Sequence, residues 1–343
     1  RLEATEVVRV ATLRETERSD ESVLFQQLLT VAPGSYTLTV AVRDEGSTKS
    51  ASTDLALRVP SFDAGSILPP LPFYEALARG TRDSLPLIVA NPRARLTYGR
   101  DSTVAVYLEA YGGDKPASLG LAIQVENVTV WTDSVSPTPA GDAMFTAIAR
   151  IPIASIGIGN AYVAVWRNGG TDTRTDTAKT PIFVGIGDEV PTTTYTDMVS
   201  YLRYFAPALR LRELGSVAPA GRGAAWAAFF REFDPSPATR ENEALQNYLV
   251  LLRQANATFQ EAATPGWRTD RGMVLLLLGP PDQVIDPFGT DAMQRGRSLL
   301  WEYRSVNLNV EFIRTGALPQ WRLTQASEAD VRAAARRLTG AGG

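Results

Sequence analysis

The chain has 343 residues, of which 44% are hydrophobic and 21% are charged, and its formal net charge is -3. This weakly acidic balance argues against a surface that follows nucleic-acid phosphates. Histidine and cysteine are both absent, which excludes imidazole or thiolate zinc sites, Ser-His-Asp and Cys-His catalysis, and haem ligation by either side chain.

Residues 1–60 are predicted to form a β-module. In residues 36–43 apolar and polar side chains alternate, which is the period of a strand with one buried face. Further strands are predicted at 7–13, 24–31 and 55–59. Four strands make a small immunoglobulin-like (Ig-like) sandwich, or part of one.

Residues 61–96 contain five prolines and are predicted to connect two modules. The segment is too apolar for a solvated linker, so we expect it to lie packed on a surface. Either it docks a partner protein, or it packs between domains of its own chain. The residues that would dock a partner are Ile67, Leu71, Phe73 and Tyr74.

Residues 97–186 read as a second Ig-like β-sandwich, because alternating strands are separated by turn-forming residues. From residue 195 the apolar spacing becomes helical. We expect three helices, the third capped near Thr239, then strands at 273–278, 299–304, 308–312 and 321–324, and a final helix. The order of these elements predicts an α+β domain over 195–343. The fold class is therefore multidomain, β-rich plus α+β, and no apolar run reaches the ~20 residues of a membrane-spanning helix.

The most specific sequence lies between the third helix and the strand at 273–278. It reads Gly266-Trp267-Arg268-Thr269-Asp270-Arg271-Gly272, and Gly279-Pro280-Pro281-Asp282 follows the apolar run. These residues resemble the signature of the GWxTD-domain family of bacterial exported proteins. Upstream, Phe233–Glu243 resembles the family's DPxPxTxxNE segment, so the resemblance covers roughly 195–325. Family members usually begin with an export signal and further β-structure, so we expect a processed or truncated form beginning at Arg1.

The GWxTD turn has a functional and a structural interpretation. Trp267 could stack on a ligand that Asp270 and Arg271 bind by charge. In the structural interpretation, which we favour, Gly266 and Gly272 permit unusual backbone angles and Trp267 fills an interface between helix and sheet. Thr269 and Asp270 would then bond nearby amides. We expect Arg271 to pair with Glu243, Asp234 or Asp282.

Acidic residues in the two matching segments offer a second type of site. They could meet as a carboxylate site for glycosidic or calcium chemistry. They lack calcium-loop spacing, and no paired motif fixes their geometry. We therefore expect no catalytic residue, no metal and no cofactor. The residues in question are Asp234, Glu241, Glu243, Asp270 and Asp282, and Asn242 lies among them in the sequence.

Together these observations predict a non-catalytic accessory or scaffold subunit that docks by protein–protein contacts. The resemblance to exported proteins implies a periplasmic location, on a larger membrane complex of the respiratory or photosynthetic kind. Two alternatives stay open: a carboxylate-based hydrolase of the envelope, and a carbohydrate- or peptide-binding module. Nucleic acid is not an expected partner.

Overall fold

The computed structural model describes residues 25–44, 46, 48–81, 84–112, 118–168, 177–287, 297–315 and 320–340. The chain divides into two compact units. The first comprises residues 1–95, 103–151 and 161–182, and the second comprises residues 96–102, 152–160 and 183–343. Four sheets and six α-helices occur among the described residues, which confirms the predicted β-rich plus α+β multidomain chain.

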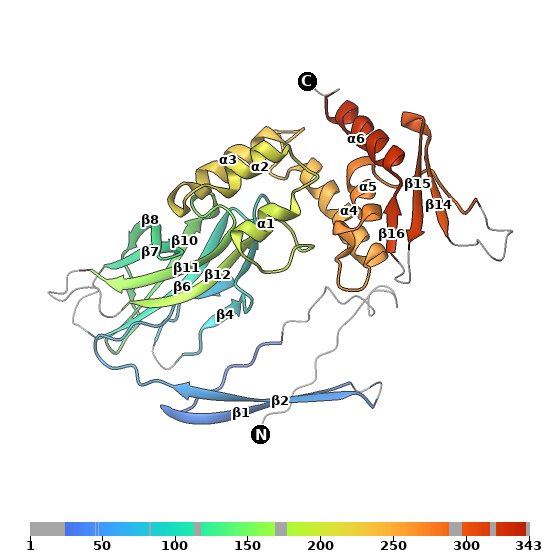
Figure 1. Ribbon diagram of the computed structural model, residues 1–343. Coiled ribbons are helices and arrows are strands. Elements are labelled where there is room, and N and C mark those ends of the chain that lie inside the picture. Colours follow the sequence, from blue (N-terminus) through green and yellow to red (C-terminus); the bar gives the residue numbers. More distant parts are fainter. Residues whose placement is uncertain are drawn as a thin grey trace. The chain divides into compact units, whose positions relative to one another are not determined.

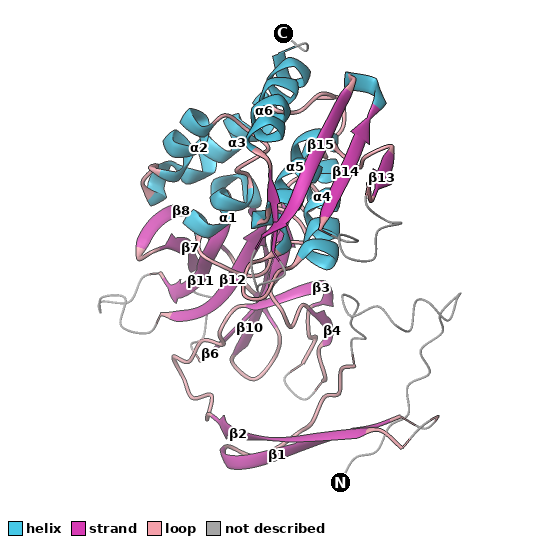
Figure 2. Cartoon of the chain, turned by 45° about the vertical axis from the view of Figure 1, so that its right-hand side comes forward, coloured by secondary structure: helices cyan, strands magenta, loops and turns pink. Residues whose placement is uncertain are grey.

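Between residues 34 and 185 the regular elements of the described residues are strands, apart from one short 3₁₀-helix (Figures 1 and 2). These strands are β1 (Gly34–Arg43), β2 (Ser50–Val59), β3 (Leu71–Leu77), β4 (Leu87–Ala90), β5 (Arg95–Thr97), β6 (Thr103–Tyr111), β7 (Leu119–Val125), β8 (Val128–Val135), β9 (Thr138–Pro139), β10 (Met144–Pro152), β11 (Gly159–Arg167) and β12 (Ala178–Gly185). Two sheets have five strands each, in the orders β4-β3-β6-β10-β9 and β5-β12-β11-β7-β8. Strand β6 is buried on both faces, as expected for a strand in a layered core.

Strands β1 and β2 form a separate two-stranded antiparallel sheet. The register runs from Gly34 opposite Val59 to Arg43 opposite Ser50, so β2 begins before the predicted 55–59. The predicted strand at 7–13 lies outside the described residues. The strand expected at 24–31 is wrong for its described part, because residues 25–31 form no strand. Their doubled glutamines and doubled leucines break the alternation that a strand face requires.

The proline-containing segment 61–96 contributes strands to the first unit. Strand β3 pairs with β4 on one side and with β6 on the other, and Ile67 bridges to Ala110. Phe73 packs with Ile88 and Tyr107 in a buried cluster. Because β4 is the terminal strand of its sheet, prolines beside it remove no ladder hydrogen bond.

The second unit places helices against a four-stranded antiparallel sheet (Figures 1 and 2). The helices are α1 (Tyr195–Tyr201), α2 (Ala208–Gly215), α3 (Arg222–Glu232), α4 (Glu243–Phe259), α5 (Asp270–Leu278) and α6 (Gln325–Gly340). The strands are β13 (Gln283–Ile285), β14 (Ser298–Tyr303), β15 (Leu308–Thr315) and β16 (Gln320–Leu323). One hydrophobic cluster joins these elements and includes Trp226, Trp267 and Trp301. Within the described residues, no helix combines the length and the apolar character that a membrane span requires.

The strand predicted at 273–278 is wrong, because Asp270–Leu278 is helix α5. A run of six apolar residues has no period of its own and suits a buried helix as well as a buried strand. The helix begins inside the motif, where the Thr269 side chain accepts a hydrogen bond from the Gly272 N–H. Thr269 is therefore an N-cap residue, and Gly279, at φ 79°, ends the helix.

Candidate functional site

The GWxTD turn begins as a short 3₁₀-helix, η4 (Gly266–Arg268), packed against α4. A Cβ atom on Gly266 would lie 1.9 Å from the carbonyl oxygen of Ala255, and one on Gly272 would lie 1.9 Å from that of Gly266. Both positions require glycine because of this close backbone approach rather than because of a left-handed φ angle. The Thr269 hydroxyl donates to the Gly266 carbonyl at 2.7 Å, which closes the turn.

Trp267 is buried, with 3% of its surface exposed. Its ring contacts Tyr201 at a centroid distance of 5.1 Å, and the Arg268 guanidinium covers it at 4.8 Å. Its backbone N–H donates to Asn256 Oδ1 at 3.2 Å. The indole ring therefore fills the core of the second unit and leaves no open face on which a ligand could stack.

Arg271 is paired with Glu261, at 3.1 Å between Nη2 and Oε1. The predicted partners Glu243, Asp234 and Asp282 are wrong, because each of them bonds elsewhere. The guanidinium also lies over the rings of Phe259 and Trp321, at 4.9 and 5.5 Å. Burial lowers the pKa of Arg271, and its bond to Glu261 acts in the opposite direction.

Glu261 is a residue that the sequence analysis missed. It stands in the loop between α4 and η4, where backbone bonds between Glu261 and Thr264 fold the loop back on itself. Its Oε1 accepts hydrogen bonds from Arg271 and also from the Trp321 N–H at 3.2 Å. No sequence motif marks Glu261 in this loop. The signal that could have found it was indirect, because a buried Arg271 requires a buried acidic partner.

Asp270 is directed at strand β16. Its Oδ2 accepts a hydrogen bond from the Leu323 N–H at 2.8 Å, and its Oδ1 lies 3.8 Å from Arg322. Asp270 and Glu261 thus hold two backbone amides of the same strand. The charged residues of the turn connect α4, α5 and β16, which is a structural use of the motif.

The upstream segment also serves to begin a helix. Asn242 is the N-cap of α4: its Oδ1 accepts from the Leu245 N–H at 2.8 Å and its Nδ2 donates to the Phe230 carbonyl at 2.8 Å. The predicted cap at Thr239 is wrong. The Thr239 hydroxyl instead donates to Glu243 at 2.7 Å, which lowers the pKa of that carboxyl.

The remaining acids are held separately. Asp234 Oδ1 accepts from the Ser236 N–H at 2.9 Å, and Asp282 Oδ2 accepts from the Arg304 N–H at 2.7 Å. Among the described residues, no three acidic side chains lie close enough together to hold a metal ion. The acidic residues that are close in sequence therefore accept hydrogen bonds in different turns, and they form no common carboxylate site.

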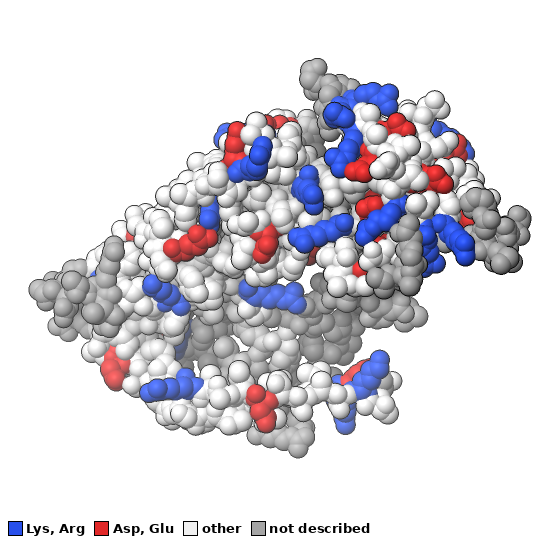
Figure 3. All heavy atoms as spheres, in the orientation of Figure 1, with Lys and Arg blue, Asp and Glu red and all other residues white. Residues whose placement is uncertain are grey.

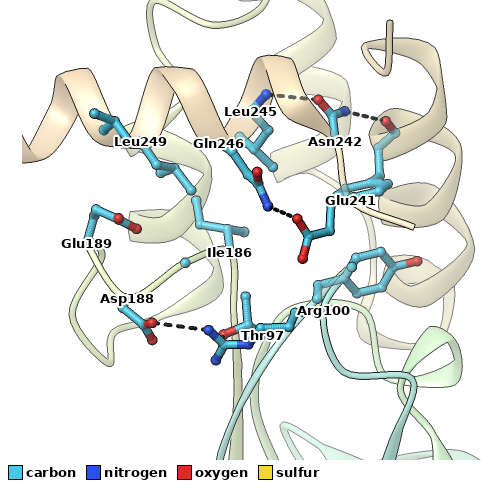
Figure 4. Close-up of a pocket in the computed structure, with 15 residues that line it drawn as sticks. Thr97, Arg100, Ile186, Asp188, Glu189, Glu241, Asn242, Leu245, Gln246 and Leu249 are labelled. Atoms are coloured by element: carbon cyan, nitrogen blue, oxygen red, sulfur yellow. Dashed lines mark hydrogen bonds and ion pairs between the residues drawn. The ribbon is translucent and has the colours of Figure 1, made fainter. Parts of the chain in front are cut away.

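A small pocket of about 230 Å³ lies within the second unit, beside the N-terminal half of α4 (Figure 4). Its floor is apolar and includes Ile186, Leu245 and Leu249. Gly187 lies in its wall, where a Cβ atom would meet Leu249 Cδ1 at 2.6 Å. The family-like segment contributes Glu241 and Asn242 to the lining, although Asn242 is fully engaged as a cap.

The rim of this pocket carries three acids and one arginine. Arg100 lies 3.3 Å from Asp188, and the Gln246 amide donates to Glu241 at 2.6 Å. Glu189 is paired with Arg253. Figure 4 shows the Arg100–Asp188 pair and the Gln246–Glu241 pair on this rim. Asp188 and Glu189 are thus each paired with an arginine, whereas Glu241 is held by the Gln246 amide. The carboxylate of Glu241 favours a cationic group over an anion in this pocket.

Among the described residues, one face of the β1–β2 hairpin is apolar and exposed. The register places Tyr36, Leu38, Val40 and Val42 on the same face as Leu57 and Leu55. Val42 is 66% exposed and Leu55 is 56% exposed. The opposite face is polar and includes a hydrogen bond of 2.6 Å from Thr39 to Asp54. A contiguous exposed apolar face of this kind indicates an interaction surface.

The four residues predicted to dock a partner differ in exposure. Phe73 is 7% exposed and belongs to the core of the first unit. Ile67 and Leu71 are half-buried. Tyr74 is 61% exposed. The sequence could not separate Phe73 from Tyr74, because the irregularity in the pairing of β3 with β4 falls between Phe73 and Glu75.

The charged side chains of the surface create no strong long-range electrostatic field. On the face that Figure 3 presents, basic and acidic side chains are interspersed, which agrees with a net charge of -3. Long-range electrostatic steering of a highly charged partner is therefore weak.

Comparison with known families identifies one domain. Residues 171–315 match the family model of the GWxTD domain, which confirms the family resemblance and places its beginning before the predicted residue 195. No match to the chain is found among curated proteins.

Proposed function

We propose that this chain, a member of the GWxTD-domain family through residues 171–315, is a non-catalytic accessory or scaffold subunit that docks by protein–protein contacts. The observation that carries the proposal is the exposed apolar face of the β1–β2 hairpin. A two-stranded hairpin is marginal in water on its own, and a partner that covers its apolar face would stabilise it.

The GWxTD turn supports this proposal by what its residues already do. Asp270, Arg271 and Thr269 bond within the second unit, and Trp267 is buried. Residues committed to internal bonds need no ligand, so the motif acts as a structural connection. Interaction then belongs to the β-rich part of the chain. We assign residues 97–186 to an Ig-like sandwich on the basis of strand number and alternation, and residues 1–60 to a β-module whose described strands are β1 and β2.

The proposed location is the periplasmic face of a larger membrane complex, respiratory or photosynthetic. Support for it comes from the resemblance to exported family members. A peripheral subunit attached by apolar sheet surfaces needs no cofactor of its own, and a chain without histidine or cysteine suits this role.

The experiment is a double substitution on the hairpin, Val42→Thr with Leu55→Thr. Threonine keeps the β-branched shape of Val42, has a high strand preference at both positions, and removes apolar area. We expect the double variant to keep its melting temperature and to lose co-purification with its complex from native membranes. A matched control is Val128→Thr on β8, where the side chain is 39% exposed. Retention of the double variant in the complex would contradict docking through the hairpin.

The acid-rimmed pocket of Figure 4 favours a second candidate function, a peptide-binding module for a basic side chain. Calorimetric titration with a lysine-containing tripeptide tests this candidate. Binding that is lost in Glu241→Gln, with unchanged melting, would support it. Absence of heat with the wild-type protein would exclude it.

A further inference from the structure

We propose that the free edge of β4 binds an extended strand of a partner protein, which is added to the sheet β4-β3-β6-β10-β9. This inference rests on the proposed docking function and identifies a second contact surface for it. Strand β4 is terminal in its sheet, so no strand of the described residues pairs with the backbone groups on its outer edge.

A side chain occupies that edge. The Gln26 amide donates through Nε2 to the Ile88 carbonyl and accepts through Oε1 from the Ala90 N–H at 2.9 Å. These two backbone groups are two residues apart on β4, and an added strand would bond to the same groups. The side-chain amide of Gln26 thus makes the two hydrogen bonds that the backbone of an added strand would make. The edge of β4 therefore binds a group that has an N–H donor next to a carbonyl acceptor, as a peptide bond does.

The side chains around the edge distinguish a docking site from a protected edge. Proteins usually protect a free edge with charged residues. Here the exposed face carries Leu77 opposite Leu87 and Glu75 opposite Val89. Leu77 is 64% exposed and Leu87 is 69% exposed. The face beside the edge is therefore apolar, whereas the edge itself is limited by the four-residue length of β4 and by the flanking Pro86 and Pro92.

A groove of about 550 Å³ runs along these residues and is lined also by Leu28 and Pro86. Among the described residues that line it, Glu75 is the one that carries a charge. Because a strand places alternate side chains on one face, the groove selects a segment in which apolar residues alternate and one residue on that face is lysine or arginine. The occupant is therefore an extended apolar segment with one basic residue.

The test uses the purified full chain and a synthetic nine-residue peptide of alternating valine and threonine with one central lysine. A matched peptide carries glutamate in place of lysine. Binding is measured by fluorescence anisotropy of the labelled peptides. We expect the lysine peptide to bind more tightly than the glutamate peptide, and Gln26→Ala to bind it several-fold more tightly because the competing amide is gone.

Two variants should weaken binding. Ala90→Pro removes the outward N–H, which a terminal strand tolerates, and we expect a loss of about tenfold. Glu75→Lys should reverse the preference between the two peptides, and this exposed position tests the proposal even if Ala90→Pro fails to fold. Val128→Thr on β8 is the control and should bind like the wild-type protein.

Four results would overturn the proposal: no binding to wild type or Gln26→Ala, equal binding to all variants, binding only after deletion of residues 1–24, or dimers that Ala90→Pro dissociates. The third would mean that the chain's own segment covers the edge, and the fourth that a second copy does. If Ala90→Pro stays in the native complex while the hairpin variant leaves it, this inference fails and the docking function stands. Peptide binding by a chain that joins no native complex would instead support the strand site and contradict the docking function.

Discussion

The guanidinium of Arg271 lies 3.1 Å from Oε1 of Glu261, and the same oxygen accepts the backbone N–H of Trp321 at 3.2 Å. One carboxylate therefore joins the GWxTD turn, the loop after α4 and strand β16. Both side chains are largely buried, at 16% and 5% exposed. The charged residue that follows the GWxTD letters is thus explained by a contact inside the unit.

We predict that Glu261→Ala lowers the free energy of unfolding of the second unit by about 3 to 5 kcal/mol, because it leaves a buried guanidinium and a buried amide without their acceptor. The double variant Glu261→Gln with Arg271→Met should lose much less, since no buried charge remains. Urea unfolding followed by tryptophan fluorescence measures both. Equal losses for the two variants would show that the ion pair is not the cause.

The close approach at Gly266 gives a second prediction. A methyl group there would meet the Ala255 carbonyl oxygen at 1.9 Å, so Gly266→Ala must displace α4 from the turn. We expect a loss of more than about 3 kcal/mol. Gly215→Ala is the control, because its Cβ would meet only Val199 Cγ1 at 3.9 Å and alanine favours a helix. A calorimetric scan in which both variants melt alike would refute the packing argument.

A substitution at Asn242 tests whether the upstream segment, residues 233–243, stabilises the start of α4. Asn242→Ala removes both the helix cap and the bond to the Phe230 carbonyl, and we expect a loss of about 2 kcal/mol. Asn242→Ser keeps a capping oxygen and should lose about half as much. Chemical denaturation ranks the variants, and an alanine variant as stable as wild type would mean that the cap is dispensable.

The regular elements of the two units could be predicted from the sequence only where the apolar residues have a clear period. Helix positions such as Trp226 and Leu245 followed from a 3.6-residue period, and the face of β1 that carries Tyr36 and Val40 followed from a two-residue period. Neither period exists in residues 273–278, so helix α5 was read as a strand. The role of Thr269 as its cap depends on where the backbone turns, which residue spacing alone does not specify.

Partners that are distant in sequence were harder still to predict. The pairing of Arg271 with Glu261 depends on how a loop folds back, and Gln26 reaches β4 from 64 positions away. In the segment 61–96 the prolines obscured strands β3 and β4, because proline is usually a sign of irregular structure. The apolar character of the segment could be predicted, whereas the burial of Phe73 and the exposure of Tyr74 could not.

Substitutions at Phe73 and Tyr74 distinguish a residue that the fold requires from a residue that is exposed on the surface. Phe73→Ala should destabilise the first unit by about 3 to 5 kcal/mol, the usual loss for a buried phenylalanine. Tyr74→Ala changes an exposed side chain and should stay within about 0.5 kcal/mol of wild type. Thermal melts of the two single variants measure this difference. If Tyr74→Ala proved the more destabilising, the order of burial along β3 would be contradicted.

Alkaline pH should destabilise the second unit. Burial raises the pKa of Tyr195 to about 12, although Arg222 acts in the opposite direction. In the unfolded chain a tyrosine ionises near pH 10, so between about pH 10 and 12 only the unfolded state loses the proton. The contribution of Tyr195 is therefore complete below pH 10 and is lost as the pH rises. Urea midpoints from pH 9 to 11.5 should fall, and Tyr195→Phe should fall less steeply.

The most direct test of docking is the mass of the natively expressed protein after gentle detergent extraction of membranes. The chain alone has a mass of 37.1 kDa. We predict that sedimentation and immunodetection find it in a membrane complex several times heavier, from which the hairpin variant Val42→Thr with Leu55→Thr is absent. A wild-type protein that sediments as a single chain, outside any complex, would contradict the account.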